Sequence, residues 1–418
     1  MYKNRMVVLR SHALKNGVIA MSGTKGAIIF LTKDPSGTLM LEDILFDPAA
    51  AWLSQTLQAA GLEQFLVVCH EEDHAAAAAC FPETAWFVTT SDRNALEKLS
   101  AFLTELSGQV LVFTSPVFLT DVGAQQLTLP GEPPQNMMGT GTFQLDAATL
   151  KRTLDEGSFR DFEEALQQAG YEYCECADWS GRSVFKLESR LDLMDVQAVA
   201  RKLTVARLVR RGVRVIDPDS VYVGPNVKVG KGTVLLPGTI LRGSTIIGEN
   251  CEIGPNTMIR DCTIGNKVTV NSSQLNESIV DNDTSIGPFA YIRPHCHVGS
   301  NVKVGDFVEL KNSNIGSDTK ISHLTYVGDA DVGRHVNFGC GTVTVNYDGH
   351  TKFRTVIGDD AFIGCNTNLV APVKVGDGAY TAAGSTITDD VPADSLAIAR
   401  SAQVNKRQWA ARRKKKER

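Results

Sequence analysis

The residue types that could do metal or redox chemistry in this 418-residue chain form no familiar motif. Its nine cysteines include no C-x-x-C pair, and Cys174-x-Cys176 is too closely spaced for a zinc knuckle. Their odd number and scattered positions favour reduced thiols in a cytosolic protein over a disulfide framework. Gly17–Lys25 (GVIAMSGTK) is a near miss for a phosphate-binding P-loop, because it lacks the Gly-Lys-Ser/Thr spacing.

A polar segment, Asn346–Arg354 (NYDGHTKFR), is a stronger candidate for a binding surface. It interrupts a rhythm that begins near residue 216, in which aliphatic residues, often followed by Gly, return at every sixth position. Hexads such as VYVGPN, VKVGKG and VGDGAY are the signature of a parallel β-helix, in which each aliphatic side chain points inward. Insertions in solenoids often build the binding face, although spacing alone fits a neutral surface excursion equally well.

The chain before residue 214 has a different pattern. Short β-rich runs at 27–31, 65–69 and 110–113 alternate with helical patterns at 49–60 and 91–106. This alternation predicts an α/β Rossmann-like domain with a mainly parallel sheet. Residues 188–212 are predicted to form one amphipathic helix that ends at Gly212. The predicted domains are 1–187 (α/β), 188–213 (linking arm), 214–399 (β-helix) and 400–418 (basic tail).

Composition and charge exclude several classes of protein. Charged residues make up 21% of the chain and hydrophobic residues 43%, which is typical of a soluble globular protein. Residues 406–418 contain eight basic residues and one acidic residue, yet the whole chain carries −5, so the body is acidic and suits nucleic acid poorly. We expect the tail to be a solvated end; contact with an anionic ligand or membrane surface is the alternative. We expect neither a membrane span nor a secretory signal, and hence a cytoplasmic location.

Residues 286–400 closely resemble the acetyltransferase half of the bifunctional N-acetylglucosamine-1-phosphate uridyltransferase / glucosamine-1-phosphate acetyltransferase family. The resemblance is carried by long ordered stretches, among them IGPFAYIRP, VGDFVELKNSNIG, ISHLTYVGDADVG, NFGCGTVTVNYDGHTKFRTVIGDDAFIG, LVAPVKVG and SLAIARS. It is weaker over the arm and the first coils, in GVRVIDPDSVYVGPNVKVG. The resemblance implies a left-handed β-helix that forms homotrimers, with sites between subunits that move acetyl from acetyl-CoA to the 2-amine of glucosamine-1-phosphate.

The resemblance also implies roles for individual residues. His323 matches the catalytic base, which must take a proton because only a neutral amine is nucleophilic. Glu309 matches the carboxylate that orients this imidazole. Arg293, Lys311 and Lys352 match residues that hold the sugar phosphate, a group that needs converging cations. The matches to polar sugar contacts are Tyr326, Asn337, Asn346 and Tyr347, and the matches to CoA contacts are Cys340, Cys365, Ala383 and Arg400.

Two of these CoA positions depart from the family pattern. Cys340 replaces a small residue, usually Ala, and Cys365 replaces the usual Ser. Because both replacements conserve side-chain size, we expect altered affinity for CoA more than its loss. A reactive thiol beside the thioester is the less favoured alternative.

The first domain departs much further from the family. The nucleotidyltransferase loop, which is rich in Gly and ends in Gly-Thr-Arg, corresponds here to LTKDPSGTLMLEDILF, with Leu39 where the Arg should stand. Pro116 falls near the place of the metal-binding Asp, and Glu188 aligns with the second metal ligand. A single carboxylate would bind Mg²⁺ poorly, and phosphoryl transfer depends on these positioning groups. We therefore expect this half to keep its fold but to have lost nucleotidyl transfer.

The leading hypothesis is a glucosamine-1-phosphate N-acetyltransferase that uses acetyl-CoA as co-substrate and no metal. One alternative is an enzyme that is still bifunctional and also makes UDP-N-acetylglucosamine from UTP. Another alternative is a non-catalytic trimeric scaffold or regulator. The presence of His323, Glu309, Arg293, Lys311 and Lys352 argues against it. Galactosamine-1-phosphate stays open as the acceptor, because the orientation of one hydroxyl is not readable from the sequence.

Overall fold

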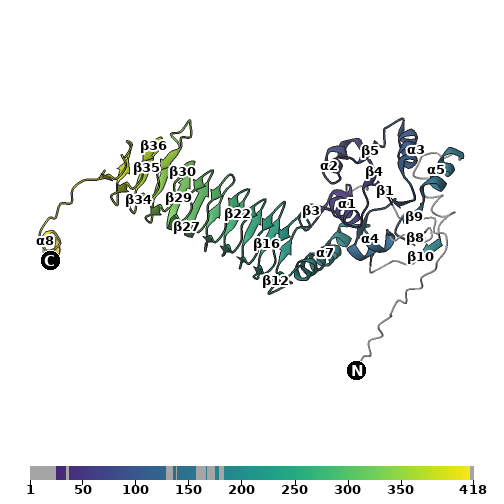
Figure 1. Cartoon of the computed structure of the whole chain (residues 1–418), viewed down its shortest axis with the longest axis horizontal. Helices are drawn as coiled ribbons and strands as arrows, with labels where there is room; N and C mark the ends of the chain where they lie inside the picture. The colour runs from purple at the N-terminus through teal and green to yellow at the C-terminus, as the bar shows by residue number, and fades with distance from the viewer. Residues whose placement is uncertain are drawn as a thin grey trace, which may run out of the picture. The chain divides into compact units, whose positions relative to one another are not determined.

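The protein is described by a computed structural model that covers residues 25–33, 37–128, 135–137, 139–156, 166, 175–177 and 183–414. It contains two compact units, Met1–Val196 and Gln197–Arg418, each visible in Figure 1. The near-miss P-loop segment lies outside the described residues except for Lys25, and Cys174 also lies outside them. The predicted four-part division of the chain stays a prediction.

The first unit is a layered α/β domain, as the alternating pattern predicts. Its main sheet has the strand order β10-β8-β9-β6-β1-β4-β5. Strands β1 (Gly26–Phe30), β4 (Gln64–Cys69), β5 (Trp86–Thr89) and β6 (Gln109–Phe113) run parallel. Strand β9 (Thr142–Asp146) is antiparallel to both β6 and β8 (Gln135–Met137), and β10 (Glu175–Ala177) is parallel to β8.

The helices of this unit cover the sheet and supply its core. They include α1 (Ala49–Ala59), α3 (Ala95–Glu105), α4 (Asp121–Leu127) and α5 (Ala147–Glu156). Helix α3 begins four residues later than its pattern predicts, because Asp92 accepts the amide of Asn94 in a turn before it. Strand residues such as Ile28 and Val112 pack with Phe102 of α3 in one buried cluster, which confirms the Rossmann-like fold.

Helix α7 (Arg190–Arg210) forms where the amphipathic arm is predicted. The Asp192 carboxylate accepts the amides of Glu188 and Ser189 at 2.9 and 2.8 Å, which satisfies donors that the first turn leaves free. The helix stops at Gly212, whose φ of +87° is the left-handed conformation that favours glycine after a helix. At its end Leu208 joins the buried core of the β-helix.

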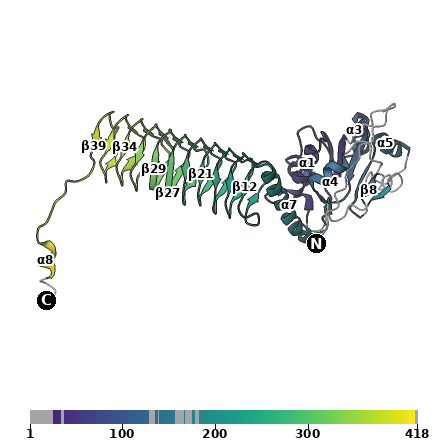
Figure 2. The same cartoon turned by 60° about the horizontal axis from the view of Figure 1, so that its bottom comes forward.

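The second unit is a left-handed parallel β-helix that begins at β12 (Arg214–Val215) and ends at β39 (Leu396–Ala397). Short strands stack coil upon coil, as Figures 1 and 2 show. One face is a ladder of nine strands, and the other strands of this unit form a second, continuous ladder. The nine are, in order, β14 (Lys228–Val229), β17 (Ile246–Ile247), β20 (Thr263–Ile264), β23 (Ile279–Val280), β26 (His297–Val298), β28 (Asn314–Ile315), β30 (Ala330–Val332), β33 (Thr355–Ile357) and β36 (Val373–Val375). Each coil buries aliphatic side chains: Leu241, Ile259, Leu275, Ile292, Leu310 and Val327 are inaccessible to solvent.

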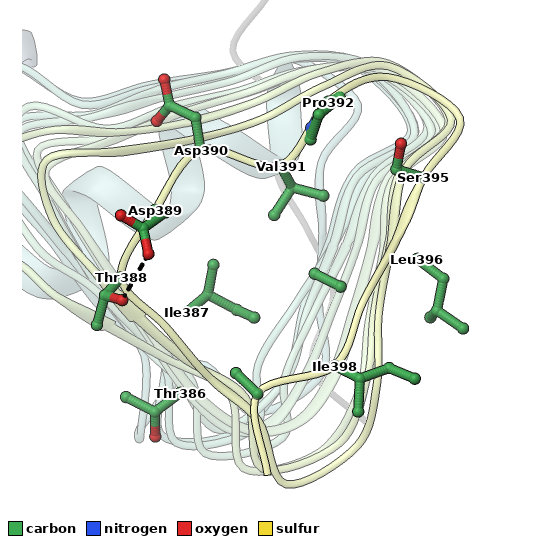
Figure 3. A pocket seen from close by; sticks show the side chains of 12 residues that line it. Thr386, Ile387, Thr388, Asp389, Asp390, Val391, Pro392, Ser395, Leu396 and Ile398 are labelled. Atoms are coloured by element: carbon green, nitrogen blue, oxygen red, sulfur yellow. Dashed lines mark hydrogen bonds between the residues drawn. The ribbon is translucent and has the colours of Figure 1, made fainter.

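The same coil architecture is visible at the C-terminal end. Figure 3 shows Ile387 and Val391 pointing between the stacked coils, where both are buried, while Leu396 lies on the outside. Buried Cys251, Cys262 and Cys296 take inward positions in earlier coils as free thiols. Cys69 and Cys80 are buried free thiols of the first unit, and the pKa of each is raised to about 11 mainly by burial.

Candidate functional site

Four of the predicted site residues, Glu309, Lys311, His323 and Tyr326, lie on two strands that run without a break around one corner of the prism. These strands are β27 (Lys303–Lys311) and β29 (Lys320–Gly328), which are paired in parallel. Most coils have two-residue or three-residue strands, so this continuous stretch is a rigid local platform. The register places Asp306 opposite His323 and Glu309 opposite Tyr326.

His323 is held by a carboxylate from the neighbouring coil. Its Nδ1 lies 2.6 Å from Asp306 Oδ1, with the side chains 60% and 40% exposed. The hydrogen bond with His323 lowers the pKa of Asp306, so the carboxylate stays ionised and Nδ1 carries the donated proton. That tautomer leaves Nε2 as the nitrogen with a free lone pair, as a general base requires.

Glu309 contacts Arg293, and its predicted role in orienting the imidazole stays a prediction. Glu309 Oε1 accepts a hydrogen bond from Arg293 Nη1 at 2.9 Å. In this chain Asp306 has the position next to His323, because the side chains of residues 306 and 323 meet at the corner while residue 309 lies further along the strand. The sequence signal for Asp306 is its spacing of 17 residues before His323, which is one coil.

Three cationic side chains converge on the face beside this corner. Hydrogen bonding with Lys352 raises the pKa of Lys311, and the same interaction lowers the pKa of Lys352. Arg293 adds to the positive field that lowers the pKa of Lys352, and hydrogen bonding to Glu309 raises the pKa of Arg293. An anion placed among these groups would relieve their mutual repulsion.

Asp329 is the carboxylate on which this arrangement depends, and sequence reasoning missed it. Its side chain is only 7% exposed, and it accepts hydrogen bonds from Lys311 Nζ at 3.2 Å, Asn312 Nδ2 at 2.5 Å and Asn346 Nδ2. Burial opposes its charged form, but these three hydrogen bonds outweigh burial and lower the pKa of Asp329. The amide of Asn346 also donates to the Tyr326 hydroxyl at 3.4 Å, so one carboxylate orders several predicted substrate contacts.

The inserted segment Asn346–Arg354 folds into a small hairpin, and both of its ends are held by hydrogen bonds to the β-helix. Tyr347 and Lys352 form an antiparallel bridge, and Asp348 Oδ1 accepts the amides of His350 and Thr351 at 2.7 Å. At the far end the Arg354 guanidinium grips Asp331 at 2.6 and 2.8 Å. This internal order shows that the segment has a defined shape that presents Lys352 toward Lys311.

The predicted CoA contacts form a column on the outside of successive coils. Register places Cys340 opposite Cys365 and Cys365 opposite Ala383, because the flanking residues pair at the same offsets on both sides. A methyl group added at Gly384, the next residue, would lie 3.8 Å from Arg400 Cδ, so Arg400 reaches the end of this column. Asn337 lies opposite Lys320 of the preceding coil and is half-buried.

The three positions singled out in the first unit lie in different surroundings. Leu39 is buried at the start of a 3₁₀ turn (Leu39–Leu41), Pro116 precedes β7 (Val117–Leu119), and Glu188 pairs with Lys186 at 2.7 Å. Among the described residues no group of three or more His, Cys, Asp or Glu side chains could hold a metal ion. Nor does any helix in the described ranges have the length and apolarity needed to cross a membrane.

Comparison with known proteins places the repeat in a class. Residues 277–312 and 354–389 match the family model for bacterial transferase hexapeptide (six repeats), in agreement with the six-residue rhythm of the second unit. A solved structure of a Francisella novicida UDP-N-acetylglucosamine acyltransferase is 16% identical with a TM-score of 0.22, covering 44% of this chain and 66% of that chain.

The chain is also similar in sequence to curated proteins that share one name. Over 226 residues the chain is 52% identical to the Bifunctional protein GlmU of Acetivibrio thermocellus, covering 54% of this chain and 49% of that protein. Over 230 residues it is 53% identical to the Bifunctional protein GlmU of Clostridium perfringens, covering 55% and 51%. These matches confirm the resemblance to the bifunctional family, and the chain spans about half the length of the curated relatives it matches.

The role of Asp329 can be tested by stability. We expect Asp329→Asn to destabilise the β-helix by about 1–3 kcal/mol, because the Lys311 ammonium loses its buried charged acceptor. Since the folded-state pKa of Asp329 is lowered, its contribution is complete above the unfolded value of about 3.9 and disappears as pH falls through the lower folded value. Urea unfolding of both proteins at neutral and acidic pH measures the difference.

Asp283→Asn is the matched control. Asp283 is also a coil residue with positive φ, but it is exposed and its ion pair with Lys267 is 3.9 Å long. We expect this variant to unfold at the wild-type urea concentration. Equal losses in the two variants, or a loss at Asp329 that persists unchanged in acid, would contradict the assigned role.

Proposed function

We propose that the β-helix transfers an acetyl group from acetyl-CoA to the 2-amine of glucosamine-1-phosphate. The observation that carries the proposal is the grouping of Lys311, which lies on the same strand as Asp306, with Arg293 of the preceding coil and Lys352 of the inserted hairpin, beside the Asp306–His323 pair. An anion site beside an oriented imidazole suits a phosphorylated substrate that must lose a proton during reaction. The relatives' bifunctional name and the transferase repeats support the same reading.

The proposed reaction is a direct attack of the amine on the thioester. The sugar phosphate binds Arg293, Lys311 and Lys352, which hold the amine in place near His323. His323 Nε2 takes the proton as the new C–N bond forms, and Asp306 stabilises the imidazolium through Nδ1. A backbone N–H supports the oxyanion of the tetrahedral intermediate. The C–S bond then breaks, and the sulfur of CoA leaves as a thiol after taking the proton from the His323 imidazolium. Galactosamine-1-phosphate is the second acceptor to assay.

Measured acetyl transfer tests these roles. We expect His323→Ala to lower kcat by about 10²–10⁴-fold and Asp306→Asn to lower it less, because the base is lost in the first variant and only its orientation in the second. Release of CoA thiol with glucosamine-1-phosphate as acceptor gives the rates.

His297→Ala is the matched control, since His297 Nε2 also contacts a carboxylate, Asp281 at 3.0 Å, but on the other ladder of the β-helix. We expect wild-type rates from this variant. Wild-type rates from His323→Ala would remove His323 from its role, and no transfer by the wild type to any amino-sugar phosphate would favour a scaffold.

We also propose that the active form is a homotrimer. Three corner residues in successive coils, Phe289, Phe307 and Leu324, are 60%, 59% and 60% exposed, and the two phenyl rings stack at 5.7 Å. Leu324 directly follows His323, so a second copy covering this apolar column would also lie beside the imidazole.

Light scattering tests the assembly. We expect the wild type to have about three times the 45.2 kDa mass of the chain at micromolar concentration, and Phe307→Asp to dissociate because a carboxylate would be buried at the contact. Ile279→Asp, an exposed apolar residue of the other ladder, is the control and should keep the wild-type mass. A monomeric wild type would contradict the proposal.

For the first unit we propose that nucleotidyl transfer is lost. Support comes from Leu39, which is buried where the family has an exposed phosphate-binding Arg, and from Glu188, which is neutralised by Lys186. The expected outcome is no pyrophosphate release from UTP and N-acetylglucosamine-1-phosphate with Mg²⁺, under conditions where acetyl transfer proceeds. Pyrophosphate release at a rate comparable to acetyl transfer would instead establish the bifunctional alternative.

A further inference from the structure

We propose that Cys340 and Cys365 form an oxidation-sensitive dithiol site, in which peroxide converts the two thiols to a disulfide. Both cysteines are exposed free thiols, whereas the described cysteines 69, 80, 251, 262 and 296 are buried. The site is therefore accessible to a small oxidant that the other described thiols do not meet.

The register of the β-helix places the two thiols on adjacent rungs. Asn337 pairs with Phe362 and Val343 with Asn368, so Cys340 lies opposite Cys365 counted from either side. The Asn366 amide donates to the Cys340 carbonyl at 2.8 Å, which ties the two turns together. Stacked parallel strands lie about 4.8 Å apart, within the Cα separation of about 4.4–6.8 Å that a disulfide requires.

The next rung on the other side holds a base. Lys320 pairs with Asn337 and Tyr326 with Val343, so His323 lies opposite Cys340. The corner column thus runs Asp306, His323, Cys340, Cys365, with Asp306 fixing the imidazole. Because the thiolate is the nucleophilic form of cysteine, an oriented imidazole one rung away makes Cys340 the thiol that reacts first.

The chemistry balances with hydrogen peroxide as the oxidant. The Cys340 thiolate attacks one peroxide oxygen, an S–O bond forms and the O–O bond breaks, which gives a sulfenic acid and hydroxide. The hydroxide takes the proton that the Cys340 thiol gave up and leaves as water. The Cys365 sulfur then attacks the Cys340 sulfur, an S–S bond forms and the S–O bond breaks. The departing hydroxide takes the Cys365 proton as a second water, so two thiols are oxidised while one peroxide is reduced.

The disulfide would join the two ends of residues 340–365 in a covalent loop, and this loop contains the inserted hairpin with Lys352. It would also change the surface at two of the predicted CoA contacts. This consequence for the acyl donor rests on the proposed function, whereas the dithiol site itself does not.

Peptide mapping of the full chain in a Cys174→Ser/Cys176→Ser background tests the site. After peroxide and alkylation, trypsin separates peptide 335–352 from peptide 355–374. We expect the non-reduced digest to contain these two peptides joined, lighter than their sum by two hydrogens. Recovery of both as separate alkylated peptides, at peroxide doses that oxidise the protein, would overturn the proposal.

Single variants test the order of events. In Cys365→Ser the sulfenic acid at Cys340 has no partner and should be trapped by dimedone, whereas in Cys340→Ser we expect Cys365 to stay unlabelled. Equal labelling of the two variants would contradict the part assigned to His323. Cys262 is the internal control, since burial raises the pKa of its thiol to about 11, and it should be alkylated only after unfolding.

Acetyl transfer by reduced and oxidised protein separates this inference from the proposed function. We expect oxidation to lower acetyl transfer in the wild type and a reductant to restore it, while the ratio of oxidised to reduced rates stays near one in Cys340→Ser, in which no thiol reacts first. A cross-link in a protein whose reduced form transfers no acetyl would refute the proposed function and leave the dithiol site intact. An active protein with no cross-link would do the reverse.

Discussion

The stacking of one coil on the next is the constraint on which the rest of this structure depends. Each inward aliphatic side chain is buried only because the coils above and below carry another at the same place, as Ile292 does between Leu275 and Leu310. The backbone hydrogen bonds between coils fix that register, and an outward side chain therefore has its neighbours dictated as strictly as an inward one. The packing of the hydrophobic core therefore also aligns polar side chains in columns on the surface.

The outer columns carry the chemistry because they inherit this fixed spacing. Asp306 meets His323 without any loop to position it, and the stacked rings of Phe289 and Phe307 continue the next column. Asp329 supplies the one deeply buried carboxylate of the region, and it ties the continuous strands to the inserted hairpin through Lys311 and Asn346. Rigid strands and one buried charge thus do the positioning that loops do in many other folds.

The sequence predicts the repeating elements well because their signal is periodic. The six-residue rhythm indicates the β-helix, and Gly212 marks the end of α7, since both depend on local rules. The partner of His323 could not be read in the same way. Residue 309 matches a family motif, yet the contact is made by Asp306, and only the register of the corner shows it. Asp329 was missed because a buried Asp in a hexad looks like any other corner residue.

The inserted hairpin has a consequence for how such a surface diversifies. Across that coil the paired residues are 25 positions apart, against 17 or 18 in its neighbours, yet the columns on either side remain aligned. The extra residues all lie at one corner, and the ion pair between Arg354 and Asp331 holds the end of the inserted hairpin. The loop at that corner can therefore change in length or sequence during evolution, to suit a different acceptor, while the register of all the other coils is kept.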